Sequence, residues 1–238
     1  MVCKTYAVFV GCLLSAGAIG CTRDAAPARV AAPEQASPSA PVPAPLSSPV
    51  SLPVPAVPQL SKWELDPENS SAEFVCRHVL SKVRGMLSKP TGTLLLDEAN
   101  PANSKITATV DVRTITTGVE ERDAHLKSPD FFDVAKYPAI TFASTAVSRS
   151  SATSYAVTGN LSMHGVTQSV TLAVTASPPF NHAGGIRRGI EATTSVNRKD
   201  FGLRWEFPGE GPGIVVGDTI QITINAELVL LPEPGKSG

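Results

Sequence analysis

The chain has few of the residues that build reactive centres. Of its 238 residues only four are cysteines and four are histidines, and 5% are aromatic. The sequence contains no Gly-x-Ser-x-Gly elbow, no phosphate-binding loop and no His-Glu-x-x-His motif. The histidines also form no His-x-His or His-x-x-x-His pair, so no metal site is expected; they are His78, His125, His164 and His182.

The sequence also has neither a large net charge nor an apolar run of transmembrane length. The formal net charge is −1, and no long basic run occurs. Nucleic acid requires a concentrated positive surface, so it is not an expected partner. The N-terminal apolar run, Tyr6–Ile19, is too short to span a bilayer.

That apolar run belongs to a segment with the layout of a secretory signal. Lys4 precedes the run, and small residues lead to Cys21. Ala18–Cys21 resembles a bacterial lipoprotein cleavage site, although Ala18 stands where Leu is usual, and an ordinary signal cut nearby is the alternative. We expect a signal peptide over residues 1–20 and an acylated Cys21 that anchors the protein. An Asp directly after the acylated Cys resembles a retention signal for the inner membrane. Thr22 stands at that position, which favours the outer membrane, facing the periplasm.

Cys76 is then expected to be the one free thiol of the folded domain, because Cys3 and Cys12 are removed with the signal peptide and Cys21 carries lipid. No intramolecular disulfide can form, although the compartment would permit one. Apolar residues surround Cys76 in AEFVCRHV, which predicts a buried and unreactive thiol.

Residues 21–60 hold almost half of the 21 prolines and no aromatic residue. Proline fixes φ, so this linker is expected to be an extended tether that reaches up to about 100 Å at ~3.1 Å per residue. The length that follows suits one domain over residues 61–232. Residues 233–238 are expected to be a disordered tail.

The domain is dominated by alternation of apolar and polar residues, which is typical of strands with one dry face. In Thr219–Leu231, for example, every second residue from Ile220 to Leu230 is apolar. The one helix-permissive stretch is Val119–Lys127, between Gly118 and Pro129. Eight or nine strands are expected: Trp63–Leu65, Ala72–Val79, Gly92–Asp97, Lys105–Thr114, Ile140–Val147, Tyr155–Met163, Val170–Ala176, Gly185–Val196 and Thr219–Leu231.

With no crossover helices, an antiparallel barrel or sandwich is the natural closure. A membrane barrel fits poorly, since Asp111, Arg113, Glu191 and Glu227 lie in mid-strand. An eight-stranded barrel is either filled by side chains or holds one small ligand. The inward positions are small or medium, so leftover apolar volume is one expectation, and a flattened, fully packed sandwich is the other that periodicity alone allows; these positions include Ala108, Val110, Gly159, Val174, Ala176 and Ala192.

Several segments resemble the YceI-like family, periplasmic lipid-binding proteins with a lipocalin-like antiparallel barrel. One is Arg122–Phe142, RDAHLKSPDFFDVAKYPAITF, and Trp63–Leu87 fits more loosely. Gly159–Leu172 is also similar, with Ser162 for Thr and Gln168 for Lys, and so are Val196–Leu203 and Val216–Leu228. The resemblance implies an eight-stranded barrel with one short helix. It also implies an elongated cavity for a polyisoprenoid or fatty-acid-like chain, no metal and no established chemistry.

Two charged segments invite a choice of role. Arg122, Asp123 and His125 would form acid–base machinery, or would fix a closing segment at the barrel rim and meet a lipid head group. One of Phe131 and Phe132 is expected under the barrel end and the other at the cavity mouth. His164 is expected to make a turn-stabilising hydrogen bond.

In Asn197–Phe207, Arg198 and Asp200 would pair, and Phe201, Leu203, Trp205 and Phe207 alternate like a strand face. Trp205 would line a channel or pack in the core. The full set of candidate cavity or mouth residues is Phe74, His78, Val110, Val112, Arg122, His125, Phe131, Phe132, Phe142, Leu161, Leu172, Val174, Ile190, Trp205, Ile222 and Ile224.

The expected function is to carry or sequester a long apolar ligand in the cell envelope: a polyisoprenoid, an isoprenoid quinone or a fatty-acid-like chain. Burial of the chain would supply the affinity. The alternatives are an envelope interaction module with a filled core, or an enzyme acting on a lipid or quinone. No cofactor is expected beyond a bound lipid, and edge strands would permit a homodimer.

Overall fold

The computed structural model of the protein describes residues 60–78, 81–182, 184–206 and 216–232. The expected signal peptide, Cys21, almost all of the linker, the tail and Phe207 lie outside these residues. Within the described residues, no helix is long and apolar enough to cross a membrane.

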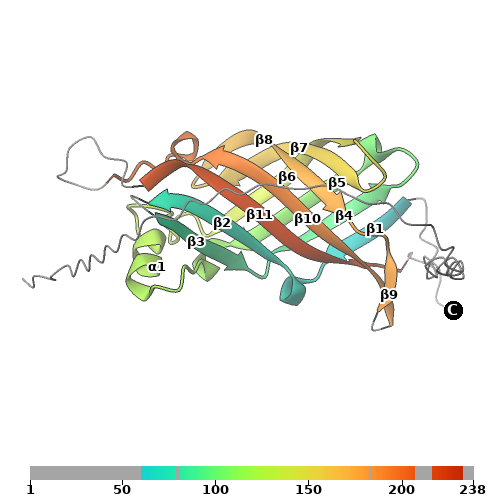
Figure 1. Cartoon of the computed structure of the whole chain (residues 1–238), viewed down its shortest axis with the longest axis horizontal. Helices are drawn as coiled ribbons and strands as arrows, with labels where there is room; N and C mark the ends of the chain where they lie inside the picture. The colour runs from blue at the N-terminus through green and yellow to red at the C-terminus, as the bar shows by residue number, and fades with distance from the viewer. Residues whose placement is uncertain (1–59, 79–80, 183, 207–215, 233–238) are drawn as a thin grey trace, which may run out of the picture. The chain divides into compact units, whose positions relative to one another are not determined.

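The described residues form one antiparallel sheet of 11 strands (Figure 1). One α-helix, α1 (Glu120–Lys127), lies between the fifth and sixth strands, as the stretch between Gly118 and Pro129 predicted. The strands are β1 (Leu60–Leu65), β2 (Ser71–His78), β3 (Ser81–Ser88), β4 (Thr91–Asp97), β5 (Lys105–Asp111), β6 (Ala139–Arg149), β7 (Ser154–Met163), β8 (Val166–Ala176), β9 (Phe180–His182), β10 (Gly185–Asn197) and β11 (Val216–Leu230).

Eight of these strands close into a barrel, which confirms the expected fold. They follow one another around the ring in the order β1, β4, β5, β6, β7, β8, β10 and β11. The long pairing of β10 with β11, from Arg187 opposite Val229 to Asn197 opposite Thr219, completes one side of the closure. On its other edge β11 pairs with β1 through Leu228–Leu230.

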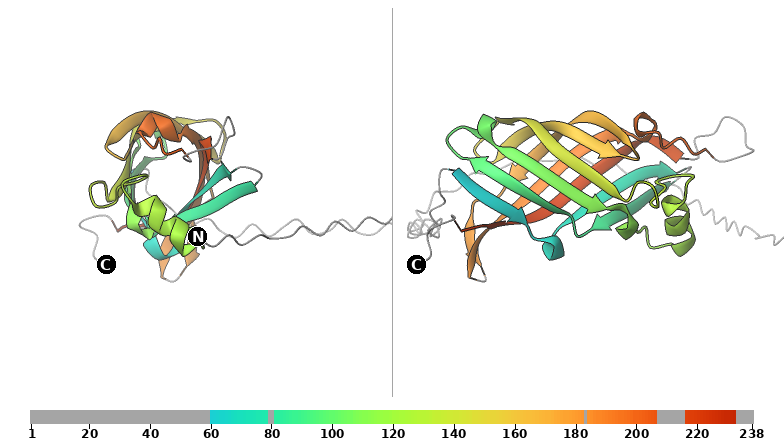
Figure 2. Two further views of the ribbon diagram at one scale, coloured as in Figure 1. Left: turned by 90° about the vertical axis from the view of Figure 1, so that its left-hand side faces the viewer. Right: turned by 180° about the vertical axis from the view of Figure 1, so that it is seen from behind.

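The β2–β3 hairpin shares that edge of β11 and widens one end of the barrel. β2 pairs with β11 from Asn225 back to Val216, where β1 no longer reaches. β3 continues outward from β2 and returns to the wall through a bridge between Met86 and Thr116. Seen from this end, the ring is open, with the hairpin at one side and α1 beside it (Figure 2).

The sequence patterns missed two strands, β3 and β9, and extended β5 by three residues. β3 was not expected, because SKVRGMLS interrupts its inward Val83 and Leu87 with a glycine and two basic residues. β9 has only three residues. β5 ends at Asp111, where a 3-10 turn, Val112–Thr114, begins.

The apolar residues of Asn197–Phe207 that the structure describes do not form a strand, so that interpretation was wrong. Arg198–Phe201 is a 3-10 helix that is capped by the Asn197 side chain. It ends at Gly202, whose φ of 79° is left-handed. Local hydrogen bonding at these two residues therefore overrides the alternation.

Candidate functional site

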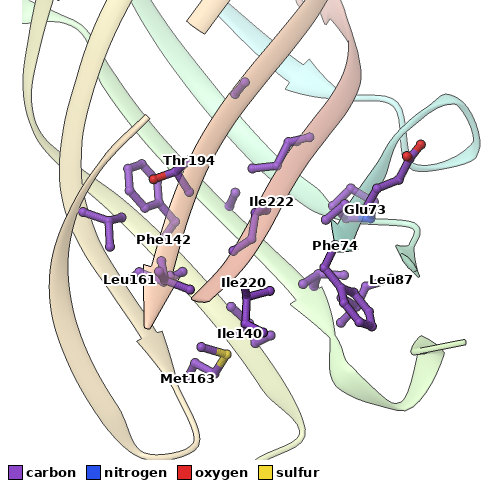
Figure 3. Close-up of a pocket in the computed structure, with 18 of the residues that line it drawn as sticks. Glu73, Phe74, Leu87, Ile140, Phe142, Leu161, Met163, Thr194, Ile220 and Ile222 are labelled. Carbon is purple, nitrogen blue, oxygen red and sulfur yellow. The ribbon is translucent and has the colours of Figure 1, made fainter. Parts of the chain in front are cut away.

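A cavity of about 620 Å³ runs inside the barrel. Every long strand contributes to its wall, and most of the lining side chains are aliphatic. On β11 the inward residues Ile220, Ile222 and Ile224 follow one another along it, as the period-two pattern predicted. Figure 3 shows Ile220 and Ile222 pointing into the same space as Leu161. We call this cavity the tunnel.

The tunnel is long and narrow. On β11 its lining extends from Val216 to Leu228. That span corresponds to about 40 Å of strand, or roughly 30 Å along the barrel axis at a tilt of about 40°. Ile220, Ile222 and Ile224 all keep partial exposure although they face inward, because the space before them is empty rather than packed.

Two phenyl rings lie over glycines of a neighbouring strand. A Cβ added to Gly159 would stand 2.7 Å from Cε2 of Phe142, and one added to Gly85 would stand 2.6 Å from Cε1 of Phe74. Because these glycines have no side chain, each ring occupies the space beside the wall.

Two polar side chains of the lining, Thr194 and Cys76, are directed to backbone carbonyls of the wall. The Thr194 hydroxyl donates to the carbonyl of Thr171 at 2.9 Å. Cys76 is buried, and its Sγ lies 3.5 Å from the carbonyl oxygen of Gly217. Burial raises the pKa of the Cys76 thiol, so it stays uncharged. The middle of the tunnel is therefore suited to hydrocarbon.

At the mouth, α1 is fixed by hydrogen bonds to the segment before it. Asp123 accepts from the Thr117 amide at 2.7 Å and from the Thr116 hydroxyl at 2.8 Å. Burial tends to raise the pKa of the Asp123 carboxyl, but the hydrogen bonds from Thr117 and Thr116 outweigh it and hold that pKa below its usual range. Asp123 is not among the tunnel-lining residues. It holds the start of the helix in place.

Arg122 joins the same anchor and also borders the tunnel. Its Nε donates to the Thr117 hydroxyl at 2.7 Å and its Nη2 to the Thr117 carbonyl at 3.2 Å. Among the described residues, Nη1 makes no hydrogen bond. Arg122 therefore has a donor left for a polar group at the mouth.

An aromatic cluster lies at this rim. The His125 ring is 5.0 Å from the rings of both Phe131 and Trp205, edge to face, and those two rings are 5.2 Å apart. His125 Nε2 also lies 3.3 Å from a carboxylate oxygen of Asp130. Phe132 lines the tunnel as Phe131 does, so both rings of the pair face it, rather than one.

Arg198 holds the chain that carries Trp205. Its side chain is buried, and Nη1 donates to the carbonyls of Leu203 at 2.6 Å and Trp205 at 3.0 Å. Nε donates to Gly217 at 3.2 Å, and Nη2 pairs with Asp218 at 3.1 Å. The expected pairing of Arg198 with Asp200 was therefore wrong, because the guanidinium turns inward to backbone carbonyls and to Asp218 instead.

This architecture recurs in known proteins. Residues 63–228 match the family described as the YceI-like domain. The chain belongs to the YceI-like family. A UPF0312 protein of Yersinia enterocolitica is 36% identical over 147 residues, which cover 60% of this chain and 76% of that protein. One of Pseudomonas putida is 34% identical over 171 residues, or 70% and 85% of the two chains.

Several solved structures share the fold. BcnA of Burkholderia cenocepacia superimposes with a TM-score of 0.59 at 25% identity, over 68% of this chain and 98% of that one. The YceI protein of Campylobacter jejuni gives 0.55 at 25% identity, over 66% and 90%. A domain of Saccharophagus degradans, described as polyisoprenoid binding, gives 0.52 at 14% identity, over 71% and 98%, which is a likeness of fold.

In this YceI-like domain, the candidate residues named from the sequence all border the tunnel except Val112. Val112 is 1% exposed and belongs to the turn after β5, where the alternation has already stopped. Whether the others touch a ligand stays a prediction. His164 bonds the Phe201 carbonyl at 3.2 Å and so links its hairpin turn to the 3-10 helix, rather than closing the turn itself.

Sequence reasoning missed part of the lining. Val83 and Leu87 were overlooked with β3, although their spacing around Gly85 was a usable signal. Arg198 was read as a local ion pair. No group of three or more His, Cys, Asp or Glu that could hold a metal occurs among the described residues.

Proposed function

We propose that the protein binds one long, unbranched or isoprenoid hydrocarbon chain in the tunnel and carries or sequesters it in the cell envelope. The observation that supports this is the continuous apolar lining from Trp205 at the mouth to Leu228 near the other end. An interaction module with a filled core would not have this cavity. Membership of the YceI-like family supports the same class of ligand.

The length of the tunnel favours long chains. The hydrocarbon core of a bilayer is about 30 Å thick and comprises two leaflets, so one ordinary acyl chain spans about 15 Å. Acyl chains in a bilayer are partly coiled, and a tunnel of roughly 30 Å accepts a fully extended chain that is longer than a common acyl chain. A polyisoprenoid, or the tail of an isoprenoid quinone, therefore fits better than a common fatty acid.

The chain would enter tail first. Each CH₂ removed from water contributes about 0.8 kcal/mol, and the middle of the tunnel offers no charged partner for a head group. The spare Nη1 donor of Arg122 and the ring of His125 lie at the mouth. A hydroxyl, carbonyl or phosphate head would remain there.

Binding rather than catalysis is supported by the roles of the charged residues. Asp123 is held by Thr116 and Thr117, and Arg122 by Thr117. These bonds position α1, and Asp123 is outside the tunnel lining. The lipid anchor at Cys21 and an outer-membrane address remain part of this proposal.

Native mass spectrometry of the full chain, purified gently from a bacterial envelope, tests the proposal. We expect a fraction of the protein to carry an added mass that is released by organic solvent and identified as a prenyl or long alkyl compound. A protein that is always empty, and that also binds no prenyl or acyl probe, would overturn it.

A further inference from the structure

The end of the tunnel opposite the mouth is closed by two unusual inward side chains. On β10 the inward residues Ile190, Ala192, Thr194 and Val196 line the tunnel. Arg188 comes next in the same alternation, opposite Leu228 of β11, but it is 8% exposed and does not line the tunnel. A guanidinium thus occupies the place where the next aliphatic side chain would continue the lining.

The second side chain is Trp63 of β1, which is fully buried. The Arg188 guanidinium lies 5.3 Å from the centre of its ring. Leu94 and Leu228, which line the last part of the tunnel, pack in one cluster with Trp63. The apolar lining therefore ends against the indole, with the charge of Arg188 above that ring.

The guanidinium is held firmly in this position. Its Nη2 pairs with Glu98 at 2.9 Å, and the other oxygen of Glu98 lies 3.4 Å from Arg149. Nε of Arg188 is buried without a hydrogen-bond partner among the described residues. A hydrocarbon that advanced further would have to displace the buried guanidinium from its partly buried partner Glu98, which is unfavourable.

We propose that Trp63 and Arg188 form a floor that sets the maximum chain length the protein accepts. This inference rests on the proposed function. Up to the floor, each added methylene is buried and improves affinity about fourfold. Beyond it, added carbons must stay in water at the mouth, so affinity stops rising.

Binding of an n-alkyl and a polyprenyl alcohol series of increasing length to the full chain tests this. The wild-type protein should gain affinity with length and then reach a plateau. Trp63→Leu should move the plateau of the n-alkyl series to longer chains by about two methylenes, since it removes a comparable volume from the floor. Ala226→Leu, at a lining position beside Ile190, should move it to shorter chains.

Trp205→Leu is the matched control. It makes the same substitution at the other tryptophan of the chain, which lies at the mouth rather than in the floor. It should change affinity at every length and leave the plateau where it is. If Trp63→Leu fails to fold, Ala226→Leu still tests the floor from within the tunnel. A plateau that stays fixed in folded Trp63→Leu and Ala226→Leu would overturn the floor. A wild-type protein that binds no chain of any length would instead overturn the proposed function.

Discussion

The ring of Phe142 lies where a side chain of Gly159 would be. The two residues face inward on neighbouring strands, β6 and β7, and a Cβ on Gly159 would come within 2.7 Å of the ring. Because the wall is closely packed, a ring displaced from Gly159 could move only into the tunnel. The glycine therefore keeps the tunnel open by letting an aromatic residue lie beside the wall.

Gly159→Ala should consequently narrow the tunnel. We expect the ring of Phe142 to be displaced inward, with loss of at least about tenfold in affinity for a prenyl probe and about 1–3 kcal/mol in the free energy of unfolding. Probe titration and urea unfolding measure the two effects. Gly189→Ala is the control, since its added Cβ meets nothing nearer than 3.6 Å. Equal binding by wild type and Gly159→Ala would contradict this role.

The Arg198 side chain should contribute more to the free energy of unfolding than the neighbouring surface cation Lys199 does. Arg198→Ala removes the buried hydrogen bonds to the carbonyls of Leu203 and Gly217 and the ion pair with Asp218, so the free energy of unfolding should fall by about 2–4 kcal/mol. Lys199→Ala removes only exposed ion pairs with Glu206 and Asp218 and should change it by less than about 1 kcal/mol. Urea unfolding of both variants measures the difference. Similar losses in the free energy of unfolding would mean that the buried guanidinium contributes no more than an exposed ion pair.

The Asp123 carboxylate should add an acid-sensitive component to stability. Its pKa is lower in the folded protein than in the unfolded chain, so the stabilisation is present above the unfolded value of about 3.9 and is lost as pH falls through the folded value. Asp123→Asn should be less stable than wild type at neutral pH, and the difference should shrink below about pH 4. Thermal unfolding between pH 2 and 7 measures it.

Glu120→Gln is a suitable control for that experiment, because Glu120 is exposed on the same helix. Its free energy of unfolding at neutral pH should differ from that of wild type by less than about 1 kcal/mol. A constant gap between Asp123→Asn and wild type down to pH 2 would show that ionisation of Asp123 does not contribute.

The Cys76 thiol should react slowly, and more slowly still with a chain in the tunnel. It is buried, burial raises its pKa, and it lines the tunnel. Because the thiolate is the reactive form, alkylation by iodoacetamide should be slow in the native protein and complete after unfolding in guanidinium. Peptide mass spectrometry locates the label. Rapid native labelling that a prenyl probe does not slow would contradict this placement.

The strands of the barrel could be predicted from the sequence because alternation is a local property. Ile220, Ile222 and Ile224 face one side whatever else the chain does, since successive strand residues point to opposite faces. Gly118 and Pro129 likewise limited α1 without any tertiary contact. The same reasoning failed at Val112 and at Arg198–Phe201, where a side chain caps a 3-10 turn and local hydrogen bonds replace the strand pattern.

The sequence by itself determined antiparallel strands with one dry face of small and medium side chains, because alternation is local, but its period of two left a barrel and a sandwich both open. Only the tertiary structure decided between them and set the dimensions of the interior. The position of Phe142 against Gly159 and that of Arg188 over Trp63 depend on strand register and closure. Those pairings join residues far apart in the chain, so no local pattern specifies how wide or how deep the tunnel is.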